Sequence, residues 1–284
     1  MKIFIRSATW ALATVSSLFA FVPENVFSSY PWNISSGLAN LESIKEHAVY
    51  VTILINRITF FIAIWLIILI GYYLFLRFRW YITIKGKNYE IRIEYGDIMK
   101  TKNSKRVINF DECYTTTVGL RPEDINENSL CGRYLKANKN LNMHQLIETA
   151  GVKPVEEKSA FQQKTKYKLG TIVVNGNDLL LAFAPLDTEG RGRFDSLKEY
   201  IECLSTMWDE IDKYYGQHDV CIPILGSGVT RFKTSGSSPT QQELLDMIIW
   251  SYKLSPYKIK PPFKLRIMCQ KRDGFSLGHI DCNN

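Results

Sequence analysis

The sequence predicts an α/β domain preceded by two transmembrane helices. Residues 3–22 and 58–76 are apolar segments near the N-terminus, with one charge, Arg6, in the first and none in the second. At about 1.5 Å of rise per residue, each is long enough to cross a hydrocarbon core of about 30 Å. Beyond residue 80, apolar runs of strand length alternate with segments of helical periodicity, which is typical of an α/β sheet.

The two apolar segments differ in what else they could be. Segment 58–76 is apolar on every face, which favours a membrane span over a helix of a soluble protein. In segment 3–22, the charges of Lys2 and Arg6 before an apolar run also fit a signal peptide. We favour a retained helix, because the bulky Phe21 and Val22 stand where a cleavage site needs small residues. A cleaved signal peptide is the alternative.

Positively charged residues predict the orientation in the membrane. Lys2 precedes the first segment, Arg77 and Arg79 follow the second, and acidic residues outnumber basic ones between the segments. Because cytoplasmic flanks carry the excess of lysine and arginine, we expect an external loop over residues 23–57 and both chain ends in the cytoplasm.

The chain is therefore predicted to have two parts. Residues 1–79 form a two-helix membrane anchor and residues 80–284 a cytoplasmic domain, which gives a multi-pass protein of the inner (plasma) membrane. Arg57 is the one charge between Val49 and Leu76. It either anchors the helix at the outer interface or, if the helix begins near Val49, lines a membrane pathway within an assembled bundle.

Local patterns predict several elements of the second part. Two alternating segments around a turn at Lys85–Asn88 indicate a hairpin. One helix follows Ser196, which with Glu199 suggests a capping box, and another follows Ser238, with Pro239 in its first position. Strands buried on both faces are predicted at Leu179–Ala184 and Val220–Leu225, and further strands at Val107–Phe110 and Leu265–Cys269.

A glycine-rich turn, Gly226–Gly228, follows the strand Val220–Leu225. Glycines let the backbone approach a ligand closely, and consecutive N–H groups can cradle phosphate oxygens. Thr230 and Arg231 add a hydroxyl group and a cation. The turn lacks the Gly-Lys-Ser/Thr ending of a Walker loop, and taken alone a Gly-x-Gly turn is more often a plain turn than a phosphate site.

Two further stretches suggest function. Asp97, between Gly96 and Ile98 at an earlier strand end, has a carboxylate that can accept a hydrogen bond from an adenine amino group; capping of a turn is the alternative. The polar stretch from Asp111 to Asn142 shows little regular pattern, and loops of that length in compact domains are usually functional.

Ordered motifs carry a resemblance to a known family. They are Val107–Tyr114, Asn128–Gly132, Leu180–Phe183 and Ile222–Gly228. Over residues 80–270 the chain resembles the macro domain, an ADP-ribose-binding α/β fold, of the Thoeris antiphage defence effectors, some of which join it to two membrane helices. The resemblance implies a macro-domain-like mixed sheet flanked by helices. The residues that it implies in ligand binding are Asp97, Ile98, Asn109, Phe110, Glu112, Gly226, Ser227, Gly228, Val229, Thr230 and Arg231.

The resemblance also implies a function. The expected protein is a membrane effector of antiphage defence that binds an ADP-ribose-derived nucleotide signal. The signal would be a histidine conjugate that a TIR-domain enzyme makes from NAD, and binding would trigger membrane disruption. Expected partners are this signal, membrane lipid and further copies of the chain, because two helices cannot enclose a pore alone.

Catalysis is not expected, because the sequence departs from hydrolytic macro domains. Asn109 is present, but Glu112 replaces the second asparagine of their Asn-Ala-Ala-Asn loop, and the glycine-rich stretch after it is missing. A membrane-tethered ADP-ribosyl hydrolase and a passive membrane-anchored adaptor are the alternatives.

Composition argues against other classes. The four histidines are scattered without ligand spacing, so no metal or cofactor is expected. The basic residues behind the net charge of +7 are dispersed, which disfavours nucleic-acid binding. The six cysteines lack paired spacing, which favours reduced thiols.

Overall fold

The computed structural model describes residues 9–10, 12–17, 21, 26–27, 47–77, 79–233, 238–271 and 275–280. The chain divides into two compact units, Met1–Arg79 and Trp80–Asn284. This division falls between the residues assigned above to the anchor and to the α/β domain.

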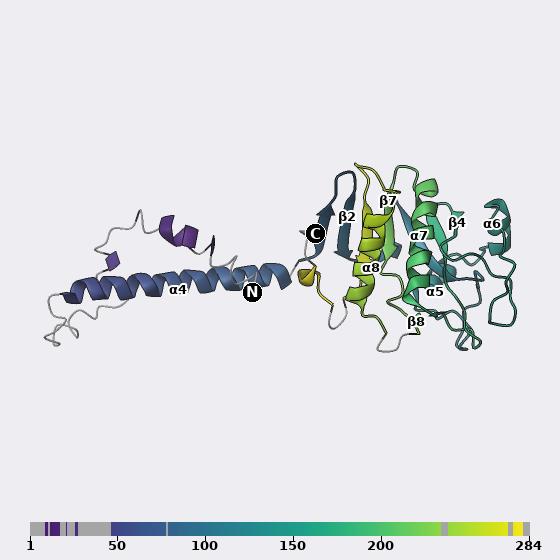
Figure 1. The fold of residues 1–284 in the computed structure, drawn as a ribbon, viewed down its shortest axis with the longest axis horizontal. Helices are drawn as coiled ribbons and strands as arrows, with labels where there is room; N and C mark the ends of the chain where they lie inside the picture. Colours follow the sequence, from purple (N-terminus) through teal and green to yellow (C-terminus); the bar gives the residue numbers. More distant parts are fainter. Residues whose placement is uncertain are drawn as a thin grey trace. The chain divides into compact units, whose positions relative to one another are not determined.

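The main element of the first unit is helix α4 (Ala48–Arg77), drawn in Figure 1. Its 30 residues correspond to about 45 Å, more than the thickness of a hydrocarbon core. Within the described residues, Ala48–Phe75 is one helix that is long and apolar enough to cross a membrane, with a mean hydropathy of 2.5. The predicted span at 3–22 lies largely outside the described residues and stays a prediction.

The predicted loop over residues 23–57 overlaps a helix at its C-terminal end, and the side of the membrane on which it lies stays a prediction. Residues 48–57 are helical and belong to α4. They contain neither proline nor glycine, so a single charge at Arg57 does not end the helix. The Arg57 guanidinium carbon lies 5.5 Å from the centre of the Phe27 ring, and the Asn56 side-chain amide donates a hydrogen bond of 2.8 Å to the Phe27 carbonyl.

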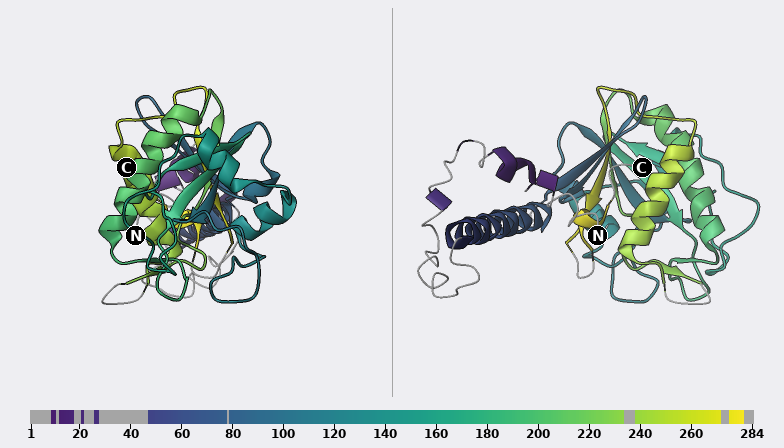
Figure 2. Two further views of the ribbon diagram at one scale, coloured as in Figure 1. Left: turned by 90° about the vertical axis from the view of Figure 1, so that its right-hand side faces the viewer. Right: turned by 60° about the vertical axis from the view of Figure 1, so that its left-hand side comes forward.

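The second unit is a seven-stranded mixed sheet with helices on both faces (Figures 1 and 2). Its strand order is β1-β2-β9-β7-β3-β5-β4. The five inner strands are parallel, and β1 and β4 pair antiparallel at the edges. The strands are β1 (Tyr81–Lys85), β2 (Glu90–Tyr95), β3 (Ser104–Asp111), β4 (Ile172–Asn175), β5 (Asp178–Ala184), β7 (Asp219–Pro223) and β9 (Leu265–Cys269). A separate parallel pair is formed by β6 (Arg193–Phe194) and β8 (Arg231–Phe232).

Two apolar clusters join the helices to the sheet. Val107 of β3 packs with α7 and α8 on one face, whereas its neighbour Ile108 packs with α5 and α6 on the other. This alternation follows from the two-residue period of a strand, and all seven residues of the inner strand β5 are buried. The helices are α5 (Leu130–Ala137), α6 (Met143–Thr149), α7 (Leu197–Tyr214) and α8 (Gln241–Leu254), with 3-10 turns η2 (Ile98–Lys100) and η3 (Leu277–His279).

The hairpin β1–β2 and the four buried strands confirm the sequence predictions, with small differences at their ends. Two helix predictions need correction. Helix α8 begins two residues later than predicted, because Thr240, not Ser238, caps it and forms a capping box with Glu243. The polar stretch before Asn142 contains α5, whose N-terminus is capped by the Ser129 hydroxyl group, which accepts a hydrogen bond from the Gly132 amide.

Candidate ligand-binding site

The carboxyl ends of the five parallel strands meet at one edge of the sheet, and a cavity of about 650 Å³ lies there. We call it the proximal cavity. Its walls come from the turn after β2, the loop after β7, the start of α5 and the end of β9. Ligands of open α/β sheets bind at this edge, because the loops that follow the strands surround it.

Asp97 forms one end of the proximal cavity. Its carboxylate accepts hydrogen bonds from the Met99 backbone N–H at 3.1 Å and from the Arg133 guanidinium at 2.6 Å. Burial alone would raise the pKa of Asp97, but these hydrogen bonds and the positive charge of Arg133 outweigh it and lower the pKa. Asp97 therefore presents an ionised acceptor to the cavity.

Arg106 fixes the turn that carries Asp97. Its guanidinium forms a two-point ion pair with Asp178, at 2.7 and 2.9 Å, across the β3–β5 pair. The same guanidinium donates to the Met99 carbonyl at 3.2 Å. Because bidentate arginine–carboxylate pairs hold a defined geometry, the sheet itself positions the Asp97 turn.

The loop Gly226–Thr230 forms the facing wall. Gly226 has a φ of +83°, and an added Cβ atom would lie 3.0 Å from the Phe232 ring, so the backbone conformation requires glycine. The Ser227 N–H donates to the Ile224 carbonyl at 3.2 Å. Within the part of the chain that the structure describes, the N–H groups of Gly228, Val229 and Thr230 have no hydrogen-bond acceptor. Three consecutive N–H groups of this kind can bind the oxygens of a diphosphate.

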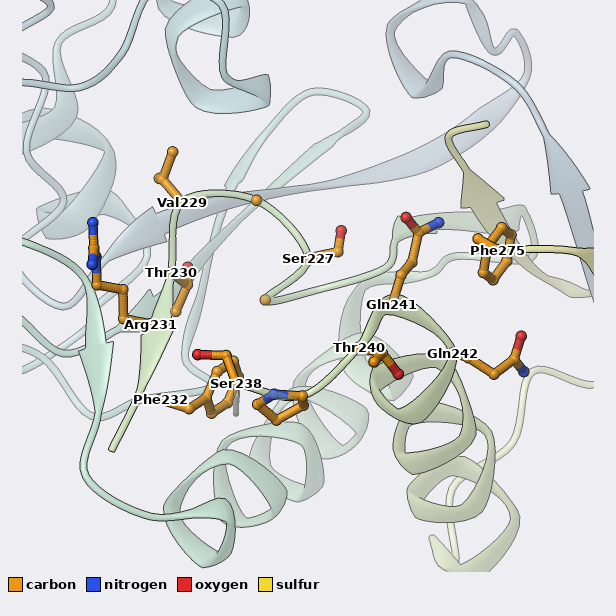
Figure 3. Close-up of a pocket in the computed structure, with 13 residues that line it drawn as sticks. Ser227, Val229, Thr230, Arg231, Phe232, Ser238, Thr240, Gln241, Gln242 and Phe275 are labelled. Atoms are coloured by element: carbon orange, nitrogen blue, oxygen red, sulfur yellow. The ribbon is translucent and has the colours of Figure 1, made fainter. Parts of the chain in front are cut away.

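The same loop borders a third cavity of about 600 Å³ on the side of α8. Figure 3 shows the loop above the start of α8, with Thr240 and Gln241 in the first turn of the helix and Phe275 nearby. Gln241 lines this cavity as well as the proximal one, and its side-chain amide donates to the Gln270 carbonyl at 3.2 Å. The Gly226–Thr230 loop therefore lines a cavity on each of two sides.

A distal cavity of about 340 Å³ continues from the proximal one. The two share Asn109, Asn126, Ser129, Val229 and Thr230 in their walls. The distal cavity extends along the loop 119–126, where Arg121 forms ion pairs with Glu123 and Asp124. A molecule longer than a nucleoside diphosphate can thus extend from Asp97 past the Gly226–Thr230 loop into the distal cavity.

Asp111 is a buried carboxyl group in the wall of the distal cavity. It accepts hydrogen bonds from the Cys113 and Thr115 N–H groups, at 2.8 and 3.1 Å. Burial raises its pKa, and these hydrogen bonds do not fully offset that effect. The sequence analysis did not select Asp111, although it directly follows Asn109 and Phe110 at the strand end.

The sequence predicted that Glu112 contacts the ligand, but the structure places its side chain away from the cavities. Its side chain is buried beneath the neighbouring loops and lines none of the three cavities. One carboxylate oxygen accepts hydrogen bonds from the Ser159 hydroxyl group at 2.5 Å and the Leu186 N–H at 3.2 Å. Because side chains alternate along an extended chain, Asp111 faces the cavity and Glu112 faces the interior.

Glu112→Ala is expected to lower the free energy of unfolding by about 1–3 kcal/mol, since it leaves two buried donors without an acceptor. It should leave the affinity for ADP-ribose unchanged within about twofold, because no ligand contact is lost. Urea unfolding and calorimetric titration of the same preparation measure both effects. Loss of affinity without loss of stability would indicate that Glu112 contacts the ligand after all.

The other predicted residues of the second unit line the cavities. Asp97, Ile98, Asn109 and the Gly226–Thr230 loop line the proximal cavity, and Phe110 lines the distal cavity. Arg231 lines the distal and third cavities but not the proximal one. Sequence reasoning missed further lining residues from loops, from the end of β3 and from the starts of α5 and α8, which are Asp111, Arg121, Asn126, Asn128, Ser129, Arg133, Arg191, Gln241 and Gln270.

The separate strand pair joins the two loops that border the distal cavity. Arg231 N–H donates to the Gly192 carbonyl at 3.0 Å, and Lys233 N–H donates to the Phe194 carbonyl at 2.8 Å. Phe194 and Phe232 stack with ring centres 5.5 Å apart in the core. The loop after β7 is thereby held against the loop after β5.

No group of three or more histidine, cysteine, aspartate or glutamate residues that could hold a metal ion occurs among the described residues. The five described cysteines carry free thiols, and burial raises the pKa of Cys113 to about 11.

Fold and cavity together define an α/β domain whose ligand site lies at the carboxyl ends of parallel strands. Residues 91–270 match the family described as Thoeris protein ThsA, Macro domain. The chain belongs to this Thoeris macro-domain family.

A curated relative and solved structures accompany this match. Thoeris protein ThsA of Bacillus amyloliquefaciens (strain Y2) is 31% identical over 189 residues, which cover 63% of this chain and 61% of the relative. The match thus spans about three fifths of that relative's length. An Oceanobacillus iheyensis macrodomain with ADP is 11% identical, with a TM-score of 0.41 over 68% of this chain and 89% of that one. The macrodomain of Thermus aquaticus DarG is 12% identical, with a TM-score of 0.37 over 64% of this chain and 98% of that one.

Proposed function

We propose that this protein is a membrane effector of antiphage defence whose macro domain binds an ADP-ribose derivative. The N–H groups of Gly228, Val229 and Thr230, which have no acceptor within the described residues, carry the proposal. They lie between the Asp97 carboxylate and the distal cavity, which is the order of adenosine, diphosphate and second ribose in ADP-ribose. Membership in the Thoeris macro-domain family supports the same ligand class.

The signal we propose is histidine-ADP-ribose, made from NAD by a TIR-domain enzyme. The distal cavity has room for a group beyond the second ribose. A thermal-shift screen of the full chain against NAD, ADP-ribose, AMP and histidine-ADP-ribose tests this, because a ligand at 100 times its Kd raises stability by about 2.7 kcal/mol. An equal response to AMP and ADP-ribose would argue against a ligand with a second ribose.

We propose binding without catalysis. The second candidate, a tethered ADP-ribosyl hydrolase, is favoured by one observation: Asp111, a buried carboxyl group, lines the distal cavity together with Asn109. Incubation of the protein with an ADP-ribosylated peptide separates the two functions. Release of ADP-ribose that is lost in Asn109→Ala and Asp111→Asn would establish the hydrolase.

We propose that the ligand acts on the membrane through α4 and a second span, in an assembly of several chains at the inner membrane. The support is the exposed apolar surface of α4, of which only 6% is buried in its most apolar window. A ligand can change the arrangement of the helices only if it binds one arrangement more tightly than another.

Arg57→Leu is expected to abolish ligand-triggered dye leakage from liposomes. Arg57 lies in the interior of α4, ten residues from its start, where a charge is costly in a bilayer unless it faces water or a partner. Nucleotide affinity and membrane insertion should persist in the variant. Unchanged leakage would make Arg57 an interfacial anchor only.

A further inference from the structure

The strand pair β6–β8 places two arginines directly opposite each other. Arg193 pairs with Arg231, and Phe194 pairs with Phe232, in parallel register. Both phenylalanine side chains are buried in the core, so the two arginine side chains leave the strand pair on its opposite face. Paired strands lie about 4.8 Å apart, which brings both guanidinium groups within reach of one small group.

Like charges at directly opposed positions are unfavourable. In residues 79–233, 238–271 and 275–280, neither Arg193 nor Arg231 forms an ion pair or a side-chain hydrogen bond. The next pair of residues along the strands differs, because Lys233 lies 4.0 Å from Asp195. Within the described residues, the positive charges of Arg193 and Arg231 are therefore not paired with a carboxylate.

The arginine pair adjoins the distal cavity. Arg231 lines that cavity, and Arg193 directly follows Gly192, which also lines it. The opposite end of the site, at Asp97, already contains its own ion pair with Arg133. An anion between Arg193 and Arg231 would thus belong to the far end of a ligand that extends from Asp97.

We infer that Arg193 and Arg231 form an anion site for a charged group attached beyond the second ribose of the ligand. This inference rests on the proposed function and narrows its ligand class. Guanidinium groups bind phosphate and carboxylate groups in the same two-point manner, so the site selects a distal phosphate or carboxylate over a neutral end. In the proposed binding mode the Gly226–Thr230 loop binds the diphosphate. The two arginines therefore remain available for a second anionic group.

Calorimetric titration of the detergent-solubilised full chain with three probes tests the inference. The probes are ADP-ribose, ADP-ribose 1″-phosphate and an ADP-ribose–amino acid conjugate with a free carboxylate. We expect one or both charged probes to bind about 10–100-fold more tightly than ADP-ribose, the range expected for hydrogen bonds between charged groups. Preference for the phosphate or for the carboxylate probe identifies which anion the site takes.

Two variants test which residues form the anion site. Arg193→Gln is expected to reduce the preference for the charged probe to less than about threefold while the affinity for ADP-ribose stays within about twofold, because Arg193 lines no cavity of the ADP-ribose site. Lys233→Gln, on the same face of the strand pair but already facing Asp195, should keep the full preference.

The outcomes separate this inference from the proposed function. If ADP-ribose binds and neither charged probe binds more tightly, the anion site is refuted and the proposed function stands. A preference that Arg193→Gln leaves intact also refutes it. If none of the three probes binds, the proposed function and the anion site are both refuted.

Discussion

Trp208→Ala is expected to lower the free energy of unfolding of the second unit by about 3–5 kcal/mol, the cost of removing a large buried aromatic side chain. Trp208 of α7 is 1% exposed, its indole N–H donates to the Ser251 hydroxyl group of α8 at 3.0 Å, and its ring contacts Tyr252. Domains of this size are stable by about 5–15 kcal/mol, so the loss removes a large share of the total.

Urea unfolding followed by circular dichroism measures this effect. Trp250→Ala is the matched control, because Trp250 is on α8, the helix that Trp208 packs against, but is 53% exposed. It should change stability by no more than about 0.5 kcal/mol, as is usual for surface positions. Because the start of α8 borders the ligand cavities, Trp208→Ala should also weaken ADP-ribose binding. Equal effects of the two substitutions would contradict the packing of α7 on α8.

Asp97→Asn is expected to weaken ADP-ribose binding by about 10–100-fold, since it replaces a charged acceptor by an amide and breaks the ion pair with Arg133. Calorimetric titration gives the affinity. Asp212→Asn, an exposed position on α7 that lines no cavity, is the matched control and should bind like the wild type.

The lowered pKa of Asp97 also predicts a pH dependence. The hydrogen bonds to Arg133 and Met99 stabilise the ionised form, so the stability they contribute is present above the unfolded pKa and is lost as the pH falls through the lowered folded pKa. Affinity for ADP-ribose should therefore stay constant from about pH 8 down to about pH 5. A fall in affinity that follows a titration near neutral pH would assign the binding step to another group.

Local sequence patterns predicted the parts of the fold that depend on local chemistry. The fully apolar run Leu179–Ala184 belongs to the buried inner strand β5, and Ser196 caps α7 as expected. The capping box does not form there, because the Glu199 carboxylate accepts from the Asp195 N–H instead. Helix α5 was missed because its eight residues show no apolar stripe long enough to stand out; its buried face depends on contact with β3 and β5.

The sequence predicted those parts of the candidate site that lie directly at strand ends. Glycines at one strand end and an aspartate at another were selected from the sequence, and both line the proximal cavity; their roles towards phosphate and adenine stay predictions. Arg133 and Asp111 could not be found in this way, because only the folded sheet and α5 bring them to the cavity. The pairing of Arg193 with Arg231 depends on the register of two strands 38 residues apart in sequence, which no local pattern specifies.

Calorimetric titration of the full chain with ADP-ribose tests the central claim most directly. The N–H groups of Gly228, Val229 and Thr230, which have no acceptor among the residues that the structure describes, and the ionised Asp97 predict saturable binding of one ADP-ribose molecule per chain, without turnover of the ligand. Absence of saturable binding by ADP-ribose and by its charged conjugates, in protein whose folded state is verified by circular dichroism, would contradict the account.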